Sequence, residues 1–143
     1  MEQMKTNRVL SGSTGECWLG EHKLGQLKSI KSTVEGEFEE YSAAGDYRTF
    51  WAYKGYKISG TLTLHKVDSY VLSLMQEAYR SGAMPELKII TKLRDVQTGQ
   101  TERVALTDVA LTKLDLANID AKTLCSEESP FLATEYDVLE AIA

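Results

Sequence analysis

Hydrophobic and polar residues alternate along most of the chain, with one clear exception near its middle. In the segment GYKISGTLTLH, Ile58, Leu62 and Leu64 fall on one side and threonines on the other, which is typical of a half-buried strand. Beyond this strand the apolar residues recur at helical spacing, and the stripe consists of Val67, Val71, Leu74, Met75 and Ala78. The pattern predicts a strand that leads into one helix at about residues 68–81, ended by Gly82.

Alternation elsewhere predicts further strands, at residues 16–19, 24–38, 86–95, 102–116 and 129–141. In two of them, 24–38 and 102–116, the apolar residues switch from odd to even positions or the reverse within the strand. A β-bulge near Gly25 or Lys28 in the first, and another near Asp108 in the second, would account for the switch. We therefore expect a mainly β fold of about six or seven antiparallel strands, closed as a β-barrel or split β-sandwich, with one flanking α-helix. Residues 1–143 form a single domain in this interpretation, and the polar residues 1–15 form a flexible N-terminal arm.

The segment 41–56, YSAAGDYRTFWAYKGY, has no clean period of either kind. Its aromatic residues are Tyr41, Tyr47, Phe50, Trp51, Tyr53 and Tyr56. Unstructured loops of this length are uncommon in compact domains and are usually functional or disordered, and this composition is not that of disorder. The sequence predicts a long interaction loop here.

Three interpretations of this segment stay open from its residues. The aromatic rings could stack on single-stranded nucleic acid, with Arg48, Lys54 and Lys57 on the phosphates. They could instead anchor a protein–protein interface, since Tyr, Trp and Arg dominate interface energies. They could also fold over the protein's own core. The net charge of −5 favours a protein partner over nucleic acid, because domains that grip phosphates are usually basic.

Composition places the chain among ordinary globular proteins, with 43% hydrophobic and 26% charged residues. No apolar run approaches the length of a membrane span, so no membrane partner is expected. The N-terminal residues lack the apolar centre of a secretory signal, and we expect the protein to be cytosolic when it is made. A disulfide between Cys17 and Cys125 is poorly supported in such a reducing compartment.

Candidate chemistry is sparse. The potential metal ligands are Cys17, His22, His65 and Cys125, and their spacing matches no common zinc pattern. Residues 12–15, GSTG, lack the lysine and the preceding strand of a phosphate loop. The acidic run at residues 35–40 is interpreted as a solvated strand end. We expect no catalytic residue, cofactor or metal, and hence no enzyme.

Two stretches carry a resemblance to a known family: SGTLTLHKV leading into the helix, and the turn and strand TGQTERVALTDV. With the order of elements around them, the chain resembles the tail tube proteins of contractile-tailed phages, including the core tail proteins of PBSX-type defective prophages. The resemblance covers essentially the whole chain.

The resemblance implies a structural subunit without enzymatic activity or cofactor. It implies hexameric rings that self-assemble into a hollow tube, through which DNA passes without specific binding. Implied partners are other copies of the chain and the tail sheath, baseplate and terminator proteins. Implied locations are the host cytoplasm during assembly and then the tail of the virion or phage-like particle. In this family a long loop or hairpin reaches a neighbouring subunit, and residues 41–56 would be that element.

Overall fold

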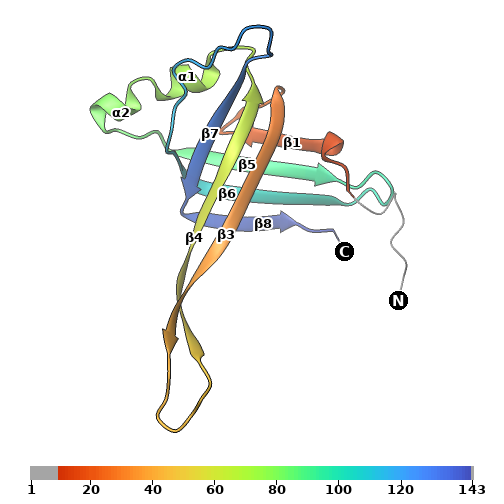
Figure 1. The fold of residues 1–143 in the computed structure, drawn as a ribbon. Helices are drawn as coiled ribbons and strands as arrows, with labels where there is room; N and C mark the ends of the chain where they lie inside the picture. The colour runs from red at the N-terminus through yellow and green to blue at the C-terminus, as the bar shows by residue number, and fades with distance from the viewer. Residues whose placement is uncertain (1–9, 143) are drawn as a thin grey trace.

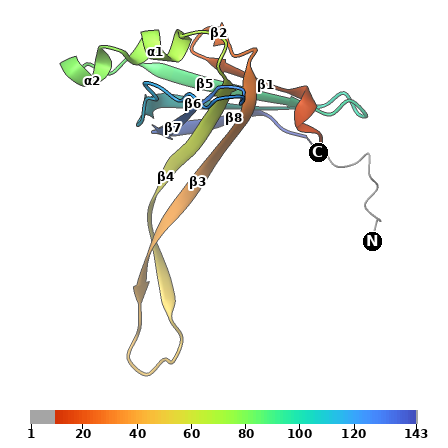
Figure 2. The ribbon, with the colours of Figure 1, turned by 45° about the horizontal axis from the view of Figure 1, so that its top comes forward.

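The computed structural model describes residues 10–142 as a β structure of two layers that cross steeply (Figures 1 and 2). The first layer contains β1 (Gly15–Leu19), β2 (His22–Lys23), β5 (Leu87–Arg94), β6 (Thr101–Leu111) and β8 (Glu135–Glu140). The second contains β3 (Leu27–Tyr41), β4 (Phe50–His65) and β7 (Ser126–Ala133), and the end of β6 joins it to the first. All strand pairs are antiparallel. The mainly β fold is confirmed.

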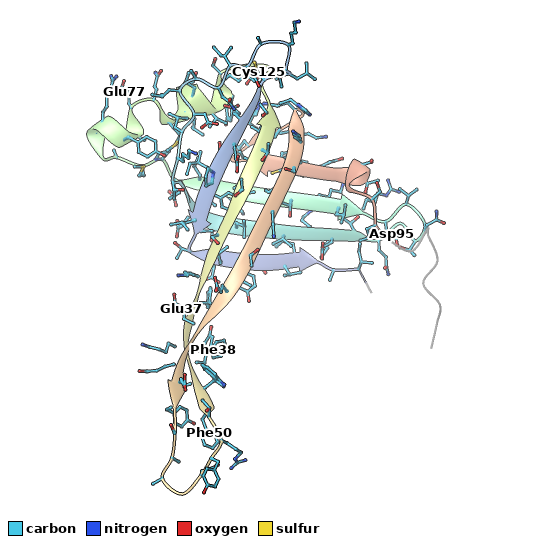
Figure 3. The ribbon with its side chains drawn as sticks, in the orientation of Figure 1. Glu37, Phe38, Phe50, Glu77, Asp95 and Cys125 are labelled. Atoms are coloured by element: carbon cyan, nitrogen blue, oxygen red, sulfur yellow. The ribbon has the colours of Figure 1, made fainter. Side chains whose placement is uncertain are left out.

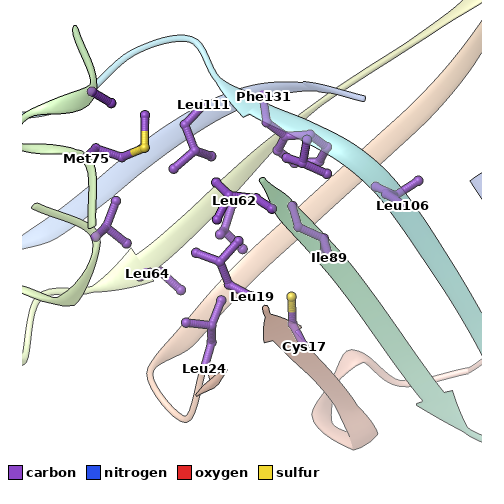
Figure 4. Packing of buried hydrophobic residues seen from close by; sticks show 14 of the residues in the cluster. Cys17, Leu19, Leu24, Leu62, Leu64, Met75, Ile89, Leu106, Leu111 and Phe131 are labelled. Atoms are coloured by element: carbon purple, nitrogen blue, oxygen red, sulfur yellow. The ribbon is translucent and has the colours of Figure 1, made fainter. Parts of the chain in front are cut away.

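The core lies between the two layers, where the inward residues of each strand meet (Figure 4). Leu62 and Leu64 of β4 are fully buried, as are Leu19 of β1 and Ile89 of β5, and Phe131 of β7 is 1% exposed. The alternation seen in residues 57–65 is therefore the alternation of a strand with one face on the core.

Gly60 sets how closely the second layer packs. A Cβ atom at this position would lie 2.2 Å from the carbonyl oxygen of Lys31 and 2.6 Å from the Phe131 ring. Both distances are far below van der Waals contact, so only glycine lets β4 approach β3 and the Phe131 ring in this way.

The predicted helical segment at residues 68–81 is confirmed, but as two short helices, α1 (Tyr70–Met75) and α2 (Ala78–Ser81). The Asp68 carboxylate accepts a hydrogen bond of 3.1 Å from the Tyr70 N–H, which satisfies one of the free amides at the helix start. Gly82 ends the second helix with φ of 75°. The buried positions of the stripe are Val71, Met75 and Ala78, while Leu74 is partly buried and Val67 is exposed.

Both predicted bulges are present. The register of β3 against β4 shifts between Leu27 and Ser29, which leaves Lys28 as the extra residue. The register of β5 against β6 shifts opposite Asp108, whose φ is 52°. A bulge explains each phase change because it inserts one residue and so reverses the facing of those that follow.

Several boundaries differ from the sequence prediction. The strand predicted at residues 102–116 ends at Leu111. The segment 129–141 is not one strand, because it divides between β7, which pairs with β4, and β8, which pairs with β6. At the division the Thr134 N–H donates to the Thr107 carbonyl at 3.1 Å. Of the predicted flexible arm at 1–15, residues 1–9 lie outside the described residues. The remainder contains a 3₁₀ turn, Gly12–Thr14, and the start of β1.

Candidate assembly interface

The most prominent feature of the molecule is the outer part of the β3–β4 hairpin, residues 34–57, which we call the hairpin arm. It projects from the body as a twisted two-stranded ribbon (Figures 1 and 2). No side chain in the hairpin arm is buried. At roughly 3.3 Å per residue, the part of β3 from residue 34 to residue 41 alone reaches about 25 Å.

The prediction of a long loop over residues 41–56 is wrong for half of that segment. Strand β3 runs to Tyr41 and β4 begins at Phe50, so only residues 42–49 connect them. A β-bulge hides the strand period. Glu37 pairs with Gly55 and Phe38 pairs with Tyr53, which leaves Lys54 as the extra residue. Gly55 has φ of 144°, a conformation that favours glycine.

Because of this bulge, one side of the hairpin arm is apolar, and we call it the apolar face. The registers Val34↔Ile58, Gly36↔Tyr56, Phe38↔Tyr53 and Glu40↔Trp51 place these residues on the side that faces the core further along β4. The large apolar side chains of the apolar face are Val34 (48% exposed), Phe38 (58%), Trp51 (63%), Tyr53 (61%) and Tyr56 (41%), and Glu40, opposite Trp51, adds one carboxylate at its outer end. The face of the β3–β4 ribbon that packs on the core therefore continues into the hairpin arm, where it is exposed to solvent.

The rings of the apolar face contact each other and the body. Phe38 meets Tyr53 edge to face at a centroid distance of 5.5 Å. Tyr56 meets Tyr136 of β8 at 5.9 Å, and its hydroxyl donates to the Glu135 carboxylate at 3.3 Å. The negative charge of Glu135 raises the pKa of Tyr56 above its ordinary value. These contacts fix the base of the hairpin arm against the body.

The opposite side of the hairpin arm is charged. Glu37 and Lys57 form an ion pair at 3.7 Å, and Glu39 and Lys54 form another at 3.9 Å. All four side chains are at least half exposed, so each pair contributes little stability. The hairpin arm is thus an amphipathic ribbon: one side is suited to burial, and the other is charged except near the tip, where Tyr41 and Phe50 lie.

The tip has its own organisation. Arg48 forms an ion pair with Asp46 at 2.8 Å and lies over the Phe50 ring at 5.2 Å from its centroid. The hydrogen bonds from Arg48 lower the pKa of Asp46, and the same pairing raises the pKa of Arg48. Tyr41 stacks on Phe50 at 5.4 Å. These contacts hold a compact tip, beside which Tyr47 stands fully exposed.

The predicted interface residues therefore divide into three groups. Trp51, Tyr53 and Tyr56 share the apolar face, Tyr41 and Phe50 stack on the other side, and Tyr47 and Arg48 lie in the connection. None of them folds over the protein's own core.

Sequence reasoning missed two exposed residues of the apolar face, Val34 and Phe38, and the exposed Tyr136, which Tyr56 contacts. The shared parity of Ile30, Val34 and Phe38 could have identified the last two, since it places Val34 and Phe38 on the same side of one strand. The interface role of all these residues stays a prediction.

The described residues contain no cluster of three or more potential metal ligands. Cys17 is fully buried, and burial raises the pKa of its thiol to about 12, whereas Cys125 is exposed. None of the helices between residues 10 and 142 has the length and apolar character needed to cross a bilayer.

The fold is shared with solved particle structures. The sheath–tube complex of an extracellular contractile injection system contains a chain with a TM-score of 0.75 at 12% identity, covering 97% of this chain and 100% of that one. The tube-terminating cap of the anti-feeding prophage gives 0.74 at 11%, covering 98% and 97%. The virion of a gene transfer agent gives 0.62 at 12%, covering 91% and 98%. At these identities the likeness shows the fold alone.

No curated protein sequence matches the chain. A family model does, over residues 2–140, and its description is "Phage tail tube protein". This match spans nearly the whole chain and agrees with the fold, and the chain belongs to the phage tail tube protein family as a structural tail tube subunit.

Proposed function

We propose that this subunit assembles with copies of itself into stacked rings, which form the hollow tube of a contractile phage-like tail. The hairpin arm is the element that joins the copies. Its role is structural rather than catalytic, and its place in a PBSX-type particle stays a prediction.

The apolar face of the hairpin arm is the observation that supports this proposal most strongly. Five large apolar side chains, each 41–63% exposed, lie on one side of the ribbon, which contacts the body at its base, where Tyr56 meets Tyr136. Exposed apolar surface rimmed by charge marks a protein interaction site. Strand β3 also ends the sheet as a long edge strand, which offers free backbone groups to a neighbouring copy.

Further partners follow from the assemblies in which similar chains occur. The similar structures are titled a sheath–tube complex, a sheath/tube terminator, a tube-terminating cap and a baseplate. By analogy we propose that a contractile sheath surrounds this tube and that a baseplate and a terminator close its ends. Assembly would take place in the host cytoplasm before the tail joins its particle.

DNA is the proposed cargo of the tube rather than a ligand of the hairpin arm. The charges of the arm do not form a basic track, because Lys54 and Lys57 pair with glutamates and Arg48 pairs with Asp46. This disfavours the alternative, a single-stranded nucleic-acid-binding barrel that uses residues 41–56. A net charge of −5 suits a conduit that DNA passes without being trapped.

Electron microscopy and sedimentation of the purified protein over a range of concentrations test the proposal. We expect reversible growth from subunits to rings and hollow tubes, and no retention of single-stranded DNA on filters at any salt concentration. A protein that stays monomeric at every concentration would contradict the tube. Salt-dependent retention of DNA by subunits that do not assemble would favour the alternative.

A further inference from the structure

We infer that the loop of residues 112–125, which we call the receiving loop, accepts the hairpin arm of the next copy along the tube. The inference rests on the proposed function and adds to it the second half of the contact between stacked copies. Both halves then lie on the same chain, as an assembly of one kind of subunit requires.

The receiving loop exposes an unusual amount of apolar surface. Leu116 is 80% exposed, and Ile119 and Leu124 are each 85% exposed. Val67, which follows β4 beside this loop, is 69% exposed. Large aliphatic side chains so open to water cost free energy in an isolated subunit, and a partner that buries them recovers it.

The loop is nevertheless held in a defined shape. The Asn118 side chain donates to the Ser126 carbonyl at 3.1 Å, and the Asp115 carboxylate accepts from the Glu128 N–H at 3.2 Å. Beside them the buried Glu127 carboxylate pairs with Lys66 at 3.5 Å. A loop that is already ordered loses less conformational entropy when a partner binds.

The receiving loop and the hairpin arm lie at opposite ends of the molecule, as the positions of Cys125 and Phe50 show in Figure 3. Strand β4 connects the two ends. It has 16 residues, so at roughly 3.3 Å per residue it spans about 50 Å. At its far end the Lys66 N–H donates to the Cys125 carbonyl at 2.9 Å.

This separation means that no subunit covers its own receiving loop with its own arm. A contact between two different surfaces of identical chains is heterologous, and it builds a closed ring or an open stack rather than a two-fold dimer. Because the two surfaces lie at opposite ends of the long strand β4, we place the contact between successive copies along the tube. The subunit therefore has two different ends, with the apolar face at one and the apolar loop at the other, as a subunit of a tube with two different ends requires. The geometry favours the arm of a second copy over an unrelated protein as the occupant.

The exposed thiol of Cys125 makes the contact directly testable. Ser42→Cys, Ala44→Cys and Thr49→Cys each place one thiol at the exposed tip of the hairpin arm. Three positions are needed because a disulfide forms only when the two Cα atoms lie about 4.4–6.8 Å apart. The other native thiol, Cys17, is fully buried and does not compete.

Mild oxidation of assembled tubes is expected to give a ladder of disulfide-linked multimers for at least one of these variants, because each subunit then carries one thiol at each end. Reducing the oxidised tubes should remove the ladder, and variants that also carry Cys125→Ser should form none. Gln97→Cys, in an exposed turn elsewhere on the body, is the matched control and should give none.

Tubes that form normally but give no Cys125-dependent linkage at any of the three positions would overturn the inference and leave the proposed function intact. Failure of the wild-type protein to form tubes would overturn both. A receiving loop that binds sheath protein in tubes, with the hairpin arm linked elsewhere, would also overturn the inference.

Discussion

Replacing Phe38 and Trp51 together by serine is expected to abolish tube formation while the isolated subunit keeps nearly the same melting temperature. Both side chains are more than half exposed, so the subunit loses little burial when they are truncated. In the tube each would be a buried anchor worth about 2 kcal/mol or more. Together they would weaken each contact by roughly a thousandfold, since about 1.4 kcal/mol is a factor of ten. Sedimentation and thermal melting measure the two effects separately.

The matched control changes the opposite side of the same ribbon. Glu39 and Ala52 are a directly paired couple on the charged side, and the double change Glu39→Ser, Ala52→Ser should leave both melting and tubes intact. Equal loss of tubes in both double variants would show that the arm acts without a preferred side. A marked drop in melting temperature for the Phe38 and Trp51 variant would show that these residues stabilise the subunit itself.

The largest effect on the subunit is expected at Phe131. Its ring is 1% exposed and lies against the backbone at Gly60, so Phe131→Ala removes a large buried group and leaves a cavity. We expect a loss of about 3–5 kcal/mol in the free energy of unfolding, measured by urea denaturation.

Leu132 is the matched control for Phe131, because it is the next residue on the same strand and points to the opposite side, where it is 49% exposed. Leu132→Ala should cost well under 1 kcal/mol. Similar losses at the two positions would mean that β7 does not present Phe131 to the core, and the packing of the two layers would have to be redrawn.

Alternation was a reliable guide where one face of a strand lies on the core. Ile58, Leu62 and Leu64 identified β4 because the interior accepts only apolar side chains at those positions. The bulges at Lys28 and Asp108 were predictable for the same reason, since a change of phase within one strand requires an extra residue.

The hairpin arm could not be predicted in this way. Its aromatic residues stand at irregular spacing because Lys54 is an extra residue and Gly55 takes a left-handed conformation. No core enforces the pattern there, and a single chain does not show which of its exposed residues another copy covers. The change of layer between β7 and β8 is also not visible in the sequence, because Tyr136 and Val138 continue the strand-like composition across it.

The emission of Trp51 tests the central claim most directly, namely that the apolar face is covered by another copy. The second tryptophan, Trp18, lies in β1 on the body, and Trp18→Phe leaves Trp51 as the single reporter. In the dilute subunit, where Trp51 is 63% exposed, we expect long-wavelength emission that iodide quenches readily. In tubes we expect a shift to shorter wavelength and protection from iodide. Emission and quenching that stay the same while tubes form would contradict the account.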